Sequence, residues 1–224
     1  MENKDLDTKQ NFVITIGRQF GSGGRELGQA LARRFGIAYY DKELLANAAR
    51  KAGMSAEVFE RNDERMPNLM GSSLSFSMGY GQLPWYSGTA MMTDSIYNAL
   101  ADVMHGVAEE GPCVIVGRSA DYVLRESHVP HVSLFVHAPI DERVRRIISR
   151  CDKSDAKTAR ALAEKTDKLR AAYYNFYTDK RWGDAPTYDF TFDSSVMSMD
   201  DICDLVALYI RRRFGIEPVR TAVN

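Results

Sequence analysis

A glycine-rich stretch follows the first apolar run of the chain, within VITIGRQFGSGGREL at residues 13–27. Glycines allow consecutive backbone N–H groups to converge on an anion, and the N-terminus of a following helix adds its positive end. An apolar run, glycines and a helical pattern in this order predict a phosphate-binding loop. The residues predicted to form it are Gly21, Ser22, Gly23 and Gly24. A plain tight connection between a strand and a helix is the alternative.

This loop lacks the lysine of the Walker A pattern G-x-x-x-x-G-K-[ST]. With the last glycine of the pattern on Gly23, Gly24 stands at the lysine position and Arg25 at the hydroxyl position that contacts Mg²⁺. Arg18 replaces the first glycine. Arginine holds phosphate oxygens through paired hydrogen bonds, so Arg18 or Arg25 could supply the missing charge. Alternatively, Arg25 pairs with Glu26 or another carboxylate and only shapes the loop. The sequence identifies no protein ligand for Mg²⁺.

The elements that must position this loop are predicted from apolar patterns. Five short runs rich in Val, Ile, Tyr and Phe lie at residues 12–16, 37–40, 113–116, 131–136 and 188–192. Stripes with helical spacing lie between them. Alternating strands and helices predict an α/β fold with a parallel sheet and helices on both faces. Ligands bind such sheets at the carboxyl ends of the strands, so functional residues are expected just after each run.

Three polar residues meet that expectation outside the glycine loop. Asp41 follows the second run and could bind an acceptor or cap the next helix. Arg118 and Asp121 follow the third run in VGRSAD. The guanidinium of Arg118 matches phosphate geometry, and the alternative is a salt bridge between Arg118 and Asp121.

Length, composition and charge limit the class of protein to which the chain can belong. A chain of 224 residues with 45% hydrophobic residues can bury one substantial core, so a single domain with an insertion is expected. The formal charge of −1 gives no indication of a nucleic acid or an anionic membrane as partner. No apolar run approaches the roughly 20 residues that span a bilayer, and no signal peptide is apparent. We therefore expect a soluble, cytoplasmic protein.

Residues 54–89 interrupt the strand and helix rhythm. The second half of this stretch, GSSLSFSMGYGQLPWYSG, has no charge and many Gly and Ser residues. We expect an insertion with a short helix near residues 56–62. Three interpretations stay open: a surface loop, a cover over the substrate, or an interface between copies of the chain.

Several longer blocks extend the pattern beyond the loop. They are ITIGRQFGSGGREL, YYDKELL, CVIVGRSADYVL, VSLFVHAPIDERVRRI and TDKLRAAYYNFYTDKRWGDAPTYDFTFDSS. Together they make the chain, over about residues 11–212, similar to the cytidylate kinase-like family, a divergent branch of P-loop proteins near the nucleoside monophosphate kinases. This branch characteristically has R-Q-[FY]-G-S-G-G in place of the lysine loop.

The resemblance implies a Rossmann-like P-loop fold with five parallel strands, a nucleotide-binding insertion and a helical lid. The core would comprise residues 11–53, 90–142 and 185–214, the insertion 54–89, and the lid region 143–184. It further implies transfer of the γ-phosphoryl group of ATP to a nucleoside monophosphate, with CMP as the candidate acceptor and with Mg²⁺. The partner would be a small nucleotide, and the insertion could join copies of the chain.

The resemblance also implies roles for particular residues. Donor phosphates would be held by the loop glycines with Ser22, Arg18 and Arg25, and the acceptor by Asp41, Arg118 and Asp121. The arginine-rich helix after Pro139 would lead into the lid, where Arg146 and Arg150, one turn apart, would close over the phosphoryl group; an ordinary solvated face is the alternative. Asp167 and Arg170 match a D-x-x-R-x-x-Y-Y motif. The predicted catalytic residues are Arg25, Arg146, Arg150 and Arg170.

Two other functions stay open from the sequence. Loss of both the lysine and the hydroxyl favours a nucleotide-binding or regulatory protein without turnover. The insertion favours a kinase for a different small acceptor.

Overall fold

The computed structural model describes residues 11–51, 85–150 and 155–219. Its sheet has five parallel strands in the order β2-β3-β1-β4-β5. The strands are β1 (Val13–Arg18), β2 (Ala38–Tyr40), β3 (Cys113–Val116), β4 (His131–His137) and β5 (Phe190–Asp193). Each coincides with one predicted run to within two residues, and the predicted α/β class is confirmed.

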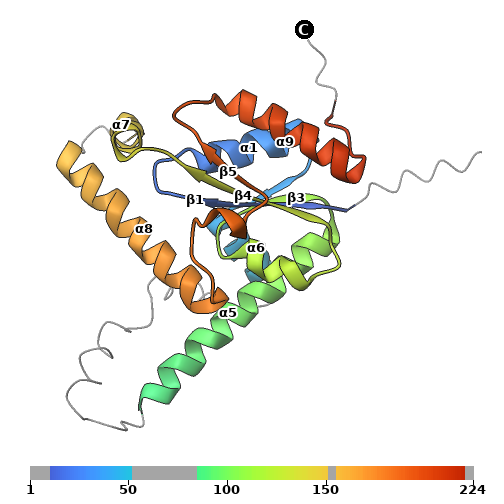
Figure 1. The fold of residues 1–224 in the computed structure, drawn as a ribbon. Coiled ribbons are helices and arrows are strands. Elements are labelled where there is room, and N and C mark those ends of the chain that lie inside the picture. Colours follow the sequence, from blue (N-terminus) through green and yellow to red (C-terminus); the bar gives the residue numbers. More distant parts are fainter. Residues whose placement is uncertain (1–10, 52–84, 151–154, 220–224) are drawn as a thin grey trace, which may run out of the picture.

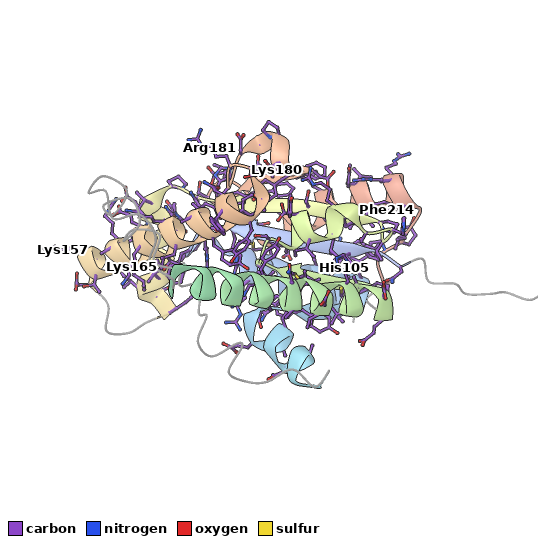
Figure 2. All side chains as sticks on the ribbon, turned by 90° about the horizontal axis from the view of Figure 1, so that it is seen from below. His105, Lys157, Lys165, Lys180, Arg181 and Phe214 are labelled. Atoms are coloured by element: carbon purple, nitrogen blue, oxygen red, sulfur yellow. The ribbon has the colours of Figure 1, made fainter. Side chains whose placement is uncertain are left out.

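Helices cover both faces of this sheet, which makes three layers (Figure 1). Helices α1 (Gly24–Phe35) and α9 (Met199–Phe214) lie on one face, and α5 (Trp85–Glu110) and α6 (Ala120–Val123) on the other. Figure 2, seen from the α5 side, shows α5 lying across the sheet with α8 (Ala156–Thr178) beside it. The remaining helical segments are α2 (Lys42–Lys51), α7 (Ile140–Arg150), η1 (Leu124–Glu126) and η2 (Ala185–Thr187).

Alternation of buried residues along β1 explains the two layers of core. Ile14 and Ile16 join the cluster beneath α1 and α9, whereas Val13 joins the cluster beneath α5. All three are at most 1% exposed. A strand that is apolar on both faces must have helices on both sides, because either face left in water would forgo the hydrophobic stabilisation.

Local signals set the ends of the helices that flank the site. Helix α1 ends at Gly36, whose φ of 62° lies in the left-handed region that favours glycine, and the N–H of Gly36 donates to carbonyls of the last turn. Helix α9 begins with a capping box in which Ser198 and Asp201 bond each other's backbone N–H.

The carboxyl ends of the central strands meet at one edge of the sheet. Arg18 of β1 is in register with Val136 of β4. Beyond the strands, the N–H of Gln19 donates to Val136 O at 3.0 Å and the N–H of Gly117 to Ile16 O at 2.9 Å. These bonds bring the glycine loop, the segment after β3 and the start of α7 together.

Part of the predicted insertion lies outside the described residues, including its expected short helix at 56–62. Helix α5 begins at Trp85, so residues 85–89 are helical. The predicted interface between copies of the chain would be formed by the same insertion, so it also lies largely outside the described residues. None of the helices that the structure describes is long and apolar enough to cross a membrane.

We expect Val114→Ala to lower the free energy of unfolding by about 2 kcal/mol, because it removes two methyl groups from the core under α1 and α9. Val114 is 0% exposed, whereas Val196 is 78% exposed. Urea unfolding of both variants measures the difference. Val196→Ala is the matched control and should change stability little; equal effects of the two changes would contradict this description of the core.

Candidate active site

The glycine loop adopts a conformation that requires glycine at two positions. Gly21 and Gly23 have φ of 79° and 89°, in the left-handed region. A Cβ at Gly21 would lie 2.9 Å from the carbonyl oxygen of Arg143, and one at Gly23 would lie 2.4 Å from Cε of Met199. Gly23 is the N-cap of α1 and offers no side-chain cap, so the N–H groups of the first helical turn remain available to an anion.

Three guanidinium groups hold the carbonyl side of the loop. Each donates to the carbonyl of an alternate loop residue: Arg170 Nη1 to Arg18 O at 3.1 Å, Arg143 Nη1 to Phe20 O at 3.2 Å, and Arg146 Nη1 to Ser22 O at 3.0 Å. Two of these three cations come from α7 and one from α8.

A buried ion pair anchors the start of the loop. Asp167 of α8 accepts from the N–H of Phe20 at 2.7 Å and from Nη1 of Arg143 at 2.6 Å. The side chains of Arg143 and Asp167 are 8% and 14% exposed. Burial raises the pKa of Asp167, while the Phe20 N–H and the Arg143 charge oppose that rise. The sequence analysis did not predict Arg143 as a site residue. For Asp167, the D-x-x-R motif was the signal in the sequence.

Arg146 and Arg150, predicted to act together, both reach the glycine loop. Arg146 also donates to Oγ of Ser194 at 2.7 Å and to its carbonyl at 2.5 Å. Arg150 forms an ion pair with Glu26 in the first turn of α1. The pair of arginines thus joins α7 to the loop and to the segment after β5. Ser194 was not predicted, and Glu26 was considered only as a partner of Arg25, whereas it pairs with Arg150.

Arg25 lies in the arrangement that the sequence left as an alternative. Its Nη2 is 2.6 Å from Oδ2 of Asp41, and this partner raises the pKa of the guanidinium. The other oxygen of Asp41 accepts from the N–H groups of Glu43 and Leu44 at 3.1 and 3.2 Å, which caps α2. Two predicted site residues therefore bind each other, and Asp41 also acts as the N-cap.

Arg18 extends from the glycine loop to the segment after β3. A Cβ at Gly24 would lie 2.5 Å from Cβ of Arg18, and one at Gly117 would lie 1.9 Å from its Nη1. The two glycines thus leave room for the arginine. Arg18 also lines a pocket at the carboxyl ends of β1 and β3, together with Arg118, Arg170, Tyr173 and Trp182.

The predicted acceptor residues Arg118 and Asp121 are close in sequence but differ in environment. Asp121 is 4% exposed and accepts a hydrogen bond of 2.6 Å from the hydroxyl of Tyr174. Burial raises the pKa of Asp121 and also that of Tyr174. Arg118 and Asp121, both described, form no salt bridge with each other, so that alternative is wrong.

Trp182 separates this pocket from a second hollow at the ends of β4 and β5. The second hollow is lined by His137, Pro139 and Asp193 as well as Trp182. The indole ring packs edge-on against Phe135, with ring centroids 5.2 Å apart. Trp182 is therefore fixed by packing and presents its remaining surface to both hollows.

We expect Asp167→Ala to lower the free energy of unfolding by about 3–5 kcal/mol, because it leaves the buried Arg143 charge without its partner. Asp141→Ala is the matched control, since Asp141 is 77% exposed and pairs with Arg160 on the surface; a change of at most about 1 kcal/mol is expected there. Chemical denaturation measures both. Similar small effects would show that the buried pair does not stabilise the fold.

A second prediction concerns pH and Asp121. Its raised pKa means that ionisation is less favourable in the folded protein than in the unfolded chain. Stability relative to Asp121→Asn should therefore be highest below the unfolded pKa of about 3.9 and should fall as pH rises through the folded pKa. Unfolding free energies of parent and variant across this range measure the difference.

Asp155 provides the control of opposite sign. Hydrogen bonds from Thr158 lower the pKa of Asp155, so stability relative to Asp155→Asn should be lost as pH falls through the folded pKa. The same trend in both variants would contradict the assignment of burial as the cause at Asp121.

One solved structure agrees with this architecture. The crystal structure of an uncharacterized protein from Eubacterium ventriosum ATCC 27560 is similar, with a TM-score of 0.67 and 27% identity over 90% of this chain and 99% of that chain. Shikimate kinase from Bacteroides thetaiotaomicron is 13% identical with a TM-score of 0.49, over 89% of this chain and 98% of that chain. A gluconokinase from Sinorhizobium meliloti 1021 is 14% identical with a TM-score of 0.49, over 91% and 93%.

No curated protein matches the sequence. Residues 13–196, however, match the model of one protein family. The match runs from the first strand to the segment after the last strand. This match confirms the resemblance carried by the glycine loop and the blocks that follow it. The chain belongs to the cytidylate kinase-like family.

Proposed function

We propose that this protein is a kinase that transfers the γ-phosphoryl group of ATP to a nucleoside monophosphate, with CMP as the candidate acceptor. One observation carries the proposal: Arg18 extends from the glycine loop to the pocket beyond β3. A guanidinium there would contact the donor phosphates on one side and the acceptor on the other. Membership of a kinase-like family supports the same reaction class.

The donor phosphates would bind at the uncapped start of α1, where backbone N–H groups and the helix dipole favour an anion. Phosphoryl transfer depends mainly on positioning and on neutralising the charge of the transition state. Arg146 lies at this loop and would add positive charge from the lid side, whereas Arg150 is paired with Glu26 of α1. Arg18 is the better candidate to replace the loop lysine, because it reaches from the glycine loop to the pocket beyond β3, whereas Arg25 is directed to Asp41.

Mg²⁺ is expected from the chemistry, and one side chain fits it. Oε1 of Glu26 pairs with Arg150, whereas Oε2 is buried without a hydrogen-bond partner, and a Cβ at Gly23 would lie 3.8 Å from Oε2. Mg²⁺ at phosphate sites needs only one or two carboxylates, because phosphates and waters fill its other positions. Glu26 would therefore hold the ion, which would neutralise charge on the phosphates. The described residues contain no cluster of three or more His, Cys, Asp or Glu side chains suited to a metal.

The acceptor would occupy the pocket lined by Arg118 and Arg170, with Tyr173 and Trp182 against its planar part. Asp121 borders this pocket but is already bonded to Tyr174, so its predicted contact with the acceptor would have to compete with that bond.

A second candidate function is nucleotide binding without turnover. Its support is specific: the loop has no lysine, and Arg25, which stands at the hydroxyl position, is paired with Asp41. A kinase for a different small acceptor is compatible with the same pocket.

The test is ADP formation from ATP and Mg²⁺ with a panel of nucleoside monophosphates including CMP. We expect Arg18→Ala to reduce kcat by roughly 100-fold, as for loss of a donor that stabilises transition-state charge. Arg18→Lys should recover part of this loss, because it restores a cation. Arg25→Ala should lower kcat only a few-fold, since Arg25 is directed to Asp41 and its side chain is 58% exposed.

Arg145→Ala is the matched control, because Arg145 lies on α7 but pairs with Glu142 on the surface. Loss of activity in Arg25→Ala, with Arg18→Ala fully active, would contradict the assignment of Arg18. ATP binding without turnover on any monophosphate would instead support the binding protein or a different acceptor.

A further inference from the structure

The turn after β3 has an unusual backbone. Gly117, Arg118 and Ser119 are consecutive residues with φ of 85°, 59° and 54°, all in the left-handed region. Glycine adopts this conformation readily, but arginine and serine do so at a cost in conformational energy. Such strain persists where the surrounding structure imposes it, and it is concentrated at functional sites.

This turn presents hydrogen-bond donors that no other described residue uses. Ser119 is 6% exposed, and its buried hydroxyl has no hydrogen-bond partner. The guanidinium of Arg118 and the backbone N–H groups of Arg118 and Ser119 also form no bond with the described residues. A buried hydroxyl without a partner is costly, so the arrangement favours a ligand that accepts these bonds.

The pocket around the turn selects the charge of that ligand. Arg18 and Arg170 line it beside Arg118 and Ser119. The one carboxylate among its described lining residues, Asp121, is engaged by the hydroxyl of Tyr174 at 2.6 Å. Three guanidinium groups and no uncommitted carboxylate make the pocket suited to an oxyanion.

We propose that residues 117–119 form the corner that binds the phosphate monoester of the acceptor, and that the Ser119 hydroxyl donates to one of its oxygens. Arg118 supplies the charge, and the aromatic side chains of Tyr173 and Trp182 contact the rest of the molecule. Ser119 is thereby a specificity-determining residue for monophosphates. The inference rests on the proposed function, because it takes this pocket as the acceptor side.

The test uses Ser119→Gly, which removes the hydroxyl and at the same time relieves the strain at φ 54°. Trp182 lines the pocket and reports binding by its fluorescence; Trp85→Phe makes it the single tryptophan of the chain. The probes are CMP, cytidine and inorganic phosphate. We expect Ser119→Gly to raise the Kd of CMP about 10-fold, the effect of losing one hydrogen bond to a charged group.

Two variants serve as matched controls. Ser119→Asn keeps a donor and tolerates the left-handed conformation, so it should bind CMP more tightly than Ser119→Gly. Ser127→Gly changes a serine that bonds Leu124 O before β4, at the opposite edge of the sheet, and should leave the Kd unchanged. Unfolding of Ser119→Gly should show no loss of stability.

The inference is overturned by an unchanged Kd of CMP in Ser119→Gly, by equal affinities for CMP and cytidine, or by the absence of any response to CMP and phosphate. Failure of the kinase proposal is distinguishable. If CMP binding depends on Ser119 but no ADP forms, the phosphate site at residues 117–119 is supported and the kinase activity is rejected. If ADP formation depends on CMP but does not change in Ser119→Gly, the kinase activity is supported and the phosphate site at residues 117–119 is rejected.

Discussion

The buried ion pair between Arg143 and Asp167 fixes the glycine loop on which the site depends. Removing two charges from water is costly unless additional hydrogen bonds satisfy them. Here Nε of Arg143 donates to Ala138 O at 3.0 Å, its Nη1 also donates to Phe20 O, and Asp167 accepts from the N–H of Phe20. The pair is therefore well satisfied, and it joins α7, α8 and the loop into one unit.

This constraint changes the origin of the positive charge at the loop. A Walker lysine belongs to the loop itself, whereas the arginines here come from α7, from α8 and from the end of β1. The positions of the arginines from α7 and α8 depend on the apolar contact between these helices, in which Val144 and Ile147 pack against Ala159 and Ala163. Packing between two helices therefore determines the electrostatics of the loop, and a change in that packing would move the charges.

The sequence predicted the secondary-structure elements better than it predicted which side chains contact each other. The central strands β1, β3 and β4 were evident because both faces of each are covered and its residues are correspondingly apolar, and the loop was evident from its glycines. The partners were not: Arg143 and Asp167 lie on different helices, and Tyr174 lies 53 residues from Asp121. Such contacts are set by how helices pack, which spacing along the chain does not specify. Carboxylates follow Arg25 at several separations along the chain, so the sequence could not identify Asp41 as its partner.

The loop bond to Asp167 bears on whether the loop remains open to a phosphate. It occupies the N–H of Phe20, at the start of the loop, and leaves the first turn of α1 uncapped beyond Gly23. An anion at a helix N-terminus binds to that first turn, so Asp167 positions the loop without taking the phosphate's place. A carboxylate that only blocked phosphate would be expected at the helix start itself. The arrangement therefore favours a preorganised phosphate site, in which the backbone geometry is fixed before the nucleotide arrives.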